Sequence, residues 1–326
     1  MSLRIIKAGI FDTVQDLGCE GSRHLGINPC GAMDRFSAQL VNALMGKPLD
    51  SALIETHYPA SRFLFAQATL VCIGGGDLAA TINEQPIPLF HPVFVPGGSI
   101  LRFDLPRSGA RSYIATLHHL DIEKWMGSSS TNLKAGAGGW HGRVLQKDDE
   151  IPFKEDAPSG IYFDQVHVLP WTAPVTIPSQ NEAGFVIGSE WQWLEKSAQQ
   201  AFQQHWFQIT NEADRMGYRL KGPALFTSHR ASLITSAVSF GTVQLLPSGQ
   251  LIVLMADHQT TGGYPRIAHV ISADLPVLAQ KKPNDVIHFQ MTDLATAESR
   301  LLGQQKYLNE IQIACKFRLE NFSRDH

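Results

Sequence analysis

Short apolar and β-branched runs separated by glycine and proline are the feature of this sequence that most constrains its fold. The runs recur about every 8–12 residues, a spacing typical of β-sandwiches and β-barrels rather than of alternating strands and helices. Glycine and proline punctuate such runs because they supply the backbone angles that tight turns need. In the first half of the chain this pattern predicts strands at 68–73, 92–95, 99–103 and 111–119, with turns at 74–76, 96–98 and 106–109.

The second half of the chain repeats this pattern. The runs 241–246 and 251–256 flank Pro247, Ser248 and Gly249. Proline presets φ for the turn and glycine accepts a positive φ, so this stretch predicts a β-hairpin. The chain is therefore expected to be mainly β.

Three segments have helical periodicity and predict short helices. The first, 34–45, places Phe36, Leu40 and Leu44 on one face, before Gly46 and Pro48. The second is predicted to begin at Ser189, with Gln192 completing a capping box. The third follows Thr292. Packing against a sheet explains all three apolar faces, and none requires a cofactor.

The chain has 326 residues, which at roughly 100–200 residues per domain predicts two domains. Five prolines and no helical period between 152 and 178 suggest the junction. We place an N-terminal β domain at residues 1–160 and a C-terminal β domain at 161–326.

Composition excludes several classes of function. Net charge is −3 and no run of like charges occurs, so we expect no nucleic-acid partner and no anionic-membrane surface. The apolar run 251–256 is far shorter than the roughly 20 residues of a membrane span. The N-terminus has too short an apolar stretch for a signal peptide, which predicts a cytoplasmic protein. The four cysteines form no C-x-x-C pair and no H-E-x-x-H occurs, so we expect no metal site.

Two motifs resemble known functional motifs but are better interpreted as ordinary structure. Gly74-x-Gly76-x-x-Ala79 follows a predicted strand, but the next residues cannot form the helix of a dinucleotide site, and a glycine hairpin is the better interpretation. The serine run 128–130 is interpreted as a loop whose hydroxyls cap their own backbone. The G-x-x-x-x-G-K-[ST] phosphate loop does not occur.

Two polar, glycine-rich segments are candidate binding segments. The first, 13–35, is either a region that binds a zwitterionic or anionic small molecule or a salt-bridged surface loop. Its charged and amide residues are Gln15, Asp16, Arg23, His24, Asp34 and Arg35. The second, 257–265, follows the apolar run 251–256 and is either a binding loop or a polar turn. Its glycines could form an anion-binding nest, and its candidate residues are Asp257, His258, Gln259, Thr260, Thr261, Gly262, Gly263 and Tyr264.

Arg215, within 211–222, is a third candidate. A guanidinium fork suits a carboxylate or phosphate ligand, although a structural ion pair is equally compatible with the sequence.

These segments also carry a family resemblance. TVQDLG, RHLG, CGAMDR, DRMGYRL, GTVQ (which contains Gln244) and DHQTTGGYPRI closely resemble the family of C-type 5-oxoprolinase subunits, also called KipA-like or allophanate hydrolase subunit 2-like. The resemblance implies two cyclophilin-like β-barrel domains and two partner chains. One partner is a KipI-like B-type subunit, and the other is an A-type subunit that opens the ring to glutamate. The resemblance also implies that Mg-ATP, shared with the partners, phosphorylates 5-oxoproline. The chain departs from the family pattern at His258, where an arginine is expected, at Cys19-Glu20, and at Pro170-Trp171.

The leading hypothesis is thus a subunit of an ATP-dependent 5-oxoprolinase. Its predicted catalytic residues are Asp257, Arg215 and Asp34. Its predicted substrate-binding residues are Gln15, Arg23, His24, Gln244, His258, Gln259, Thr260, Thr261, Gly262, Gly263 and Tyr264.

Two alternatives remain open. One is a carboxyltransferase component acting on urea or another amide. Since no Met-Lys-Met biotin attachment site occurs here, the biotin would arrive on another chain. The other is a KipA-like, non-catalytic antagonist of a kinase inhibitor.

Overall fold

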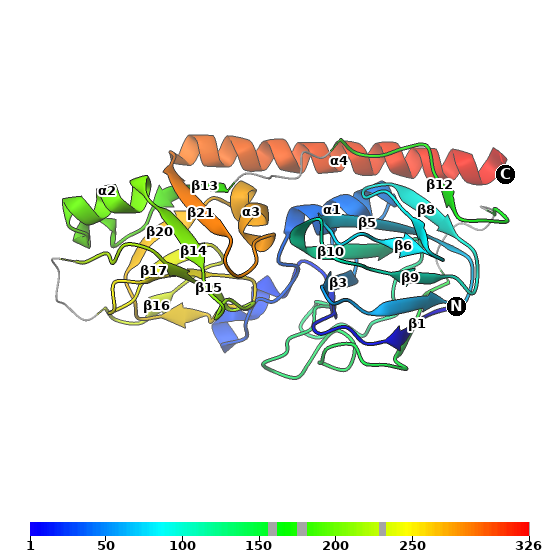
Figure 1. Ribbon diagram of the computed structural model, residues 1–326, viewed down its shortest axis with the longest axis horizontal. Helices are drawn as coiled ribbons and strands as arrows, with labels where there is room; N and C mark the ends of the chain where they lie inside the picture. The colour runs from blue at the N-terminus through cyan, green and yellow to red at the C-terminus, as the bar shows by residue number, and fades with distance from the viewer. Residues whose placement is uncertain (156–161, 175–180, 228–232, 326) are drawn as a thin grey trace. The chain divides into compact units, whose positions relative to one another are not determined.

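The computed structural model describes residues 1–155, 162–174, 181–227 and 233–325 (Figure 1). The chain divides into two compact units, each assembled from separate stretches of sequence. Unit 1 comprises Met1–Gly18, Asp34–Ile177 and Gln305–His326, and unit 2 comprises Cys19–Met33 and Pro178–Gln304. The boundary predicted between 160 and 161 lies outside the described residues and stays a prediction.

Unit 1 contains two six-stranded sheets. The first has the order β11-β1-β4-β9-β6-β7. Its strands are β1 (Ser2–Lys7), β4 (Arg62–Phe65), β6 (Thr81–Ile82), β7 (Gln85–Pro86), β9 (Ile100–Arg102) and β11 (Glu150–Pro152). The second has the order β12-β8-β5-β10-β3-β2. Its strands are β2 (Thr13–Gln15), β3 (Leu53–His57), β5 (Thr69–Asp77), β8 (Pro92–Val95), β10 (Ser108–Thr116) and β12 (His167–Val168).

The alternating residues of these strands build the core of unit 1. Ile5, Phe63, Ile73 and Ile114 are among the buried members of a single apolar cluster that draws on both sheets. The helix α1 (Arg35–Leu44) contacts β5 and β10 (Figure 1) and buries Leu40 among other apolar residues. The sequence predicted this helix correctly.

Unit 2 is a closed seven-stranded barrel with the order β13-β20-β17-β18-β15-β14-β21. A parallel pair, β13 with β21, closes a ring whose other pairs are antiparallel. The strands are β13 (Glu182–Ile187), β14 (Trp206–Ile209), β15 (Gly217–Lys221), β17 (Thr242–Leu245), β18 (Leu251–Leu254), β20 (Arg266–Val270) and β21 (Val286–Met291).

Aromatic side chains fill this barrel. Phe202 stacks on Phe289 with ring centroids 5.0 Å apart and meets Phe185 edge to face at 4.9 Å. Such pairs add to the free energy gained from burying the rings. The other elements of unit 2 are η1 (Glu20–Leu25), η2 (Trp191–Trp193), α2 (Lys196–Gln204), η3 (Ser272–Asp274), α3 (Leu275–Ala279) and a ribbon of β16 (Ser236–Ala237) with β19 (Thr261–Gly262).

The prediction of a mainly β protein with barrel architecture is confirmed, and so is the hairpin across 247–249. There β17 pairs with β18 through Leu245 and Leu251, and Gly249 has φ 81°. The third helix begins close to the predicted position but is long: α4 runs Leu294–Asp325, with residues 294–304 in unit 2 and the rest in unit 1.

Two local predictions were wrong. The glycines 74–76 form no hairpin, because β5 continues through them to Asp77. A Cβ on Gly74 would lie 2.3 Å from Phe90 and 2.5 Å from Val41, so glycine is needed here for packing rather than turning. The helix predicted from Ser189 begins only at Lys196, since Glu190 is engaged by Arg266 and Leu194 is extended.

No helix in the described part of the chain is both long and apolar enough to cross a membrane.

Candidate functional site

An ion pair lies at the centre of the predicted site residues of unit 2. Arg215 donates through Nε and Nη2 to the two carboxylate oxygens of Asp257, each at 2.9 Å. Their side chains are only 5% and 15% exposed, so the charges are largely desolvated. Nη2 also donates to the Gly31 carbonyl at 2.6 Å. The guanidinium predicted to bind a substrate carboxylate therefore holds a carboxylate of its own chain.

Asn28 ties the segment 19–33 to the same loop. Its Nδ2 donates to the carbonyls of Asp257 and His258, both at 2.7 Å. The backbone N–H of Asp257 donates to the Arg215 carbonyl at 2.8 Å. The beginning of the loop 257–265 is thus fixed by both other predicted segments.

The two central residues of this loop are extended. Thr261 pairs with Ala237 and Gly262 with Ser236, in the ribbon of β19 and β16. This is not the alternating turn conformation that an anion nest requires, so the predicted nest does not form. Buried Gln244 lies beneath the loop, and a Cβ on Gly262 would lie 2.5 Å from its Nε2.

The remaining predicted residues of unit 2 differ in their hydrogen bonds and in their exposure to solvent. Arg23 donates to the Val238 carbonyl. His24 is exposed, with Nδ1 3.1 Å from the Gly21 carbonyl. His258 is buried, and its Nδ1 lies 2.5 Å from the Gln259 carbonyl. Thr260 and Gln259 are half-buried, whereas Gly263 and Tyr264 are exposed.

Unit 1 holds the other two predicted residues. Asp34 caps α1, because its carboxylate accepts from the backbone N–H of Ser37 at 2.9 Å and from the Ser37 hydroxyl at 2.7 Å. Gln15 is fully buried and donates to Thr13 Oγ1 at 2.9 Å. Both side chains are engaged in local structure of unit 1. Their predicted catalytic and binding roles stay predictions.

Sequence reasoning missed a second ion pair in unit 2. Arg266 donates from Nε and Nη2 to Glu190 at 3.0 and 2.8 Å, and from its backbone N–H at 2.8 Å. Burial opposes ionisation of Glu190, but the hydrogen bonds and charge of Arg266 outweigh it and lower the pKa of the carboxyl. Arg266 also donates to the Ala237 carbonyl, so this pair braces the ribbon beside the loop.

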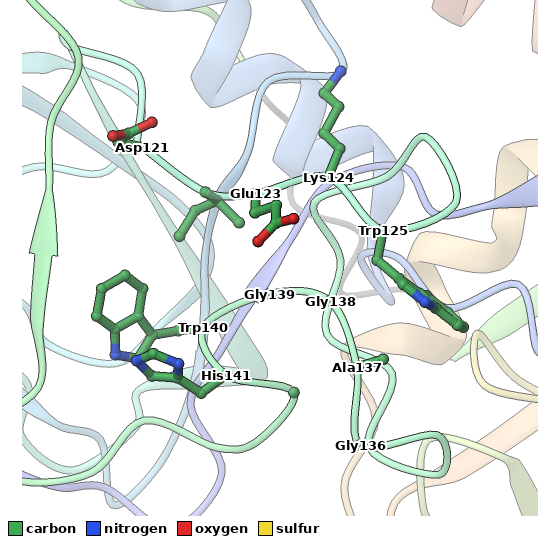
Figure 2. Close-up of a pocket in the computed structure, with 12 residues that line it drawn as sticks. Asp121, Glu123, Lys124, Trp125, Gly136, Ala137, Gly138, Gly139, Trp140 and His141 are labelled. Carbon is green, nitrogen blue, oxygen red and sulfur yellow. The ribbon is translucent and has the colours of Figure 1, made fainter.

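A pocket of about 410 Å³ lies within unit 1 (Figure 2). The predictions from the sequence do not include this pocket, although the glycine-rich run 136–142 contains Trp140, a combination that can indicate a binding loop. The pocket is lined by Asp121, Ile122, Glu123, Lys124, Trp125, Gly136, Ala137, Gly138, Gly139, Trp140, His141 and Gly142.

Asp16 anchors one side of this pocket. Its carboxylate accepts from the hydroxyls of Ser128 and Ser130 and from the backbone N–H of Ser129, each at 2.6 Å. Ser128 Oγ also accepts from the backbone N–H of Ser130 at 3.0 Å, which agrees with the prediction that the hydroxyls cap their own backbone. The sequence did not predict that two of these hydroxyls bind a distant aspartate. Ser128 in turn pairs with Trp125 through two backbone hydrogen bonds.

Comparison with known proteins identifies the family. The family model for the carboxyltransferase domain, subdomain A and B, matches residues 25–291. The chain belongs to this carboxyltransferase domain family. It is 33% identical to the C-type 5-oxoprolinase subunit of Escherichia coli K12 over 98% of this chain and 100% of that protein. It is 32% identical to the protein of the same name from Haemophilus influenzae, over 92% of this chain and 94% of the relative.

Solved structures of larger proteins contain the same carboxyltransferase domain fold. The urea amidolyase of K. lactis superposes with a TM-score of 0.87 at 23% identity, covering 95% of this chain and 20% of that one, which shows the fold alone. TTHA0988 superposes with a TM-score of 0.77 at 27% identity, covering 89% of this chain and 55% of that one. The matched residues 25–291 of the family include both the loop cluster and the pocket.

Proposed function

We propose that this chain is a subunit of an ATP-dependent 5-oxoprolinase and acts together with partner chains. The observation that carries the proposal is the similarity to the C-type 5-oxoprolinase subunit of E. coli, which extends over 98% of this chain and all of that protein. Because the match covers nearly all of both chains, it supports the same role for both proteins rather than a single domain in common.

The chemistry explains why ATP is expected. Water opens a lactam slowly because resonance stabilises the amide. Phosphorylating the lactam oxygen with ATP yields ADP and makes the ring carbon more electrophilic, so that water adds to it. Breaking the C–N bond then opens the ring to an acyl phosphate, and a second water releases glutamate and inorganic phosphate. Such a reaction needs a water-poor site with fixed donors for the phosphoryl group. We expect the partner chains to supply part of that site.

In unit 2, the proposal assigns the ion pair a positioning role. Arg215 and Asp257 hold the loop that carries Thr260 and Thr261, whose hydroxyls face the transferred group in this proposal. The geometry that supports this is the double hydrogen bond between the two side chains and their contact with the Gly31 carbonyl. The Asp257 side chain is 15% exposed, so it is not fully sealed from solvent.

The test is ADP release by the complex of this chain with its two presumed partners, the KipI-like chain and the ring-opening chain. We expect release to rise on addition of 5-oxoproline, to be unaffected by avidin, and to show no response to urea. Proline, which has no lactam carbonyl, is the control substrate. ADP release that does not respond to 5-oxoproline would refute the proposal.

A carboxyltransferase reaction on urea is the second candidate. It is favoured by the family description and by a urea amidolyase of Saccharomyces cerevisiae that is 28% identical over 94% of this chain. This chain spans only 17% of that relative, so the rest of such an enzyme would have to be supplied by other chains. Avidin-sensitive, urea-dependent turnover in the same assay would establish it.

A further inference from the structure

The long helix α4 (Leu294–Asp325), drawn in orange and red in Figure 1, presents apolar side chains to solvent. Ile313 is 70% exposed and Phe317 is 66% exposed, and the two lie about one helical turn apart. The opposite side of the helix is buried through Leu308, Cys315 and Leu319. Large apolar side chains that are adjacent and exposed on one helix face are typical of an interaction surface. We refer to the solvent-facing side of residues 306–320 as the outer face.

We propose that the outer face binds the outer face of a second copy of this chain, with the two helices antiparallel and related by a two-fold axis at Ile313. In such a contact, a residue before Ile313 meets the residue equally far after it in the other copy. Ile313 then packs against itself, and Phe317 packs against the exposed Asn309 of the second copy on each side of the axis. The proposal goes beyond the proposed function, because no step of that reaction enters it.

The charges of the outer face select this arrangement. Lys306 and Glu320 lie seven residues before and after Ile313, so both project from the same side of the helix as Ile313, and both are exposed. In the antiparallel pair, each Lys306 lies opposite Glu320 of the second copy, which gives two attractive contacts. In a parallel, in-register pair each residue would lie opposite its own counterpart, and like charges would repel.

Only a second copy can join these two charges. On an ideal α-helix Lys306 and Glu320 are about 21 Å apart along the axis, too far to pair within one chain. Within its own helix Lys306 lies 3.9 Å from Glu310, an exposed contact of a kind that contributes little free energy. An unrelated partner would need no symmetry, so opposite charges at equal spacing about Ile313 favour a second copy as the occupant.

The test is sedimentation equilibrium of the full chain alone over a range of concentrations. About four turns of helix from each copy form a small contact, so we expect a reversible dimer with a dissociation constant roughly in the micromolar range. Ile313→Asp should leave the chain monomeric, because two carboxylates would then meet at the axis. Since Ile313 is exposed, the urea unfolding midpoint should stay that of wild type, which separates loss of association from loss of folding.

Charge reversal tests the pairing itself. Lys306→Glu alone and Glu320→Lys alone should each weaken the dimer roughly tenfold, because each replaces two attractive contacts by two repulsive ones. The double variant with both changes should recover an affinity close to that of wild type, since opposite charges meet again. Arg318→Glu is the matched control. It makes the same charge change at an exposed position of the same helix, roughly 140° round from Ile313, and should leave the affinity unchanged.

A wild-type chain that stays monomeric at every concentration, or a dimer that Ile313→Asp leaves intact, would overturn the proposal. A double charge variant no tighter than the single variants would also overturn it, because that result excludes the antiparallel pairing. A monomeric chain whose binding to the KipI-like partner chain is lost in Ile313→Asp would overturn it as well, by assigning the outer face to that partner. The dimer measurement is independent of ADP release, which tests the proposed function separately.

Discussion

Two aspartates shielded from solvent, Asp16 in unit 1 and Asp257 in unit 2, each hold a candidate site together by different chemistry. Among the described residues, Asp16 accepts from neutral groups, namely the hydroxyls and a backbone N–H of the serine run and the backbone N–H of Gly18. Asp257 pairs with the guanidinium of Arg215, which is 5% exposed. The difference lies in what remains when the carboxylate is lost. Hydroxyls can turn to other acceptors, but a buried cation cannot be neutralised.

The largest effect is expected from Asp257→Asn. It leaves Arg215 charged and poorly paired, which typically costs about 3–5 kcal/mol of unfolding free energy. Urea unfolding of the isolated chain measures this. Replacing both residues at once, with Arg215→Met and Asp257→Leu, should recover most of the loss because neither charge is then buried. A single variant as stable as wild type would mean that the pair is solvated and holds no loop.

The next largest loss of stability is expected for Gly139→Ala, with Gly136→Ala as its control. Both positions have positive φ, at 53° and 62°, so both variants incur the same backbone strain of about 1–2 kcal/mol. Only at Gly139 would the new Cβ meet Thr131. We expect Gly139→Ala to be destabilised by about a further 1–3 kcal/mol from overpacking. Equal unfolding midpoints for the two variants would show that Gly139 is not packed tightly against Thr131.

Asp16→Asn should cost less than Asp257→Asn, about 2 kcal/mol, because charge-assisted hydrogen bonds weaken but no charge is orphaned. It should also broaden or shift the amide signals of Gly138 and Gly139, which pack against Ser130 and Thr131. Asp148→Asn, at an exposed ion pair with Arg4, serves as the matched control in unit 1. If Asp16→Asn lost as much unfolding free energy as Asp257→Asn, the neutral partners of Asp16 and the charged partner of Asp257 would not account for any difference between the two sites.

Glu190→Gln tests the acid sensitivity of unit 2. The pKa of Glu190 is lowered in the folded protein, since Arg266 outweighs the effect of burial. The stability it contributes is therefore present above the ordinary value of 4.5 and is lost as pH falls through the folded pKa. We expect the variant to be less stable by about 1–2 kcal/mol at pH 7, with the difference from wild type shrinking below pH 4.5. A difference that is independent of pH would contradict the pairing.

Local signals were sufficient for part of the fold. Asp34, followed by apolar residues at helical spacing, predicted α1, and Pro247 to Gly249 predicted the hairpin of β17 and β18. Both predictions were possible because capping and turn chemistry act within a few residues. The glycines of β5 could not be interpreted this way, since their cause is Phe90 packing from elsewhere in the chain. The sequence alone does not distinguish a glycine that forms a turn from one that is needed because a side chain from elsewhere in the chain packs against it.

The sequence likewise predicted some residues of the candidate sites but not their contacts. Charge and glycine content found Arg215 and Asp257, but the sequence could not show that they bind each other. The pocket was missed because it depends on Asp16 reaching the serine run, more than a hundred residues away along the chain. Glu123 and Trp125 carry no local signal that separates them from an ordinary loop.

The role of this chain in a 5-oxoprolinase is best tested by measuring the ADP and glutamate released from 5-oxoproline and ATP by the three-chain complex, with this chain present or omitted. We expect equal amounts of both products with all three chains, and a loss of 5-oxoproline-dependent ADP release without this one. The same rate of both products in its absence would contradict the claim that this chain is a working part of a 5-oxoprolinase.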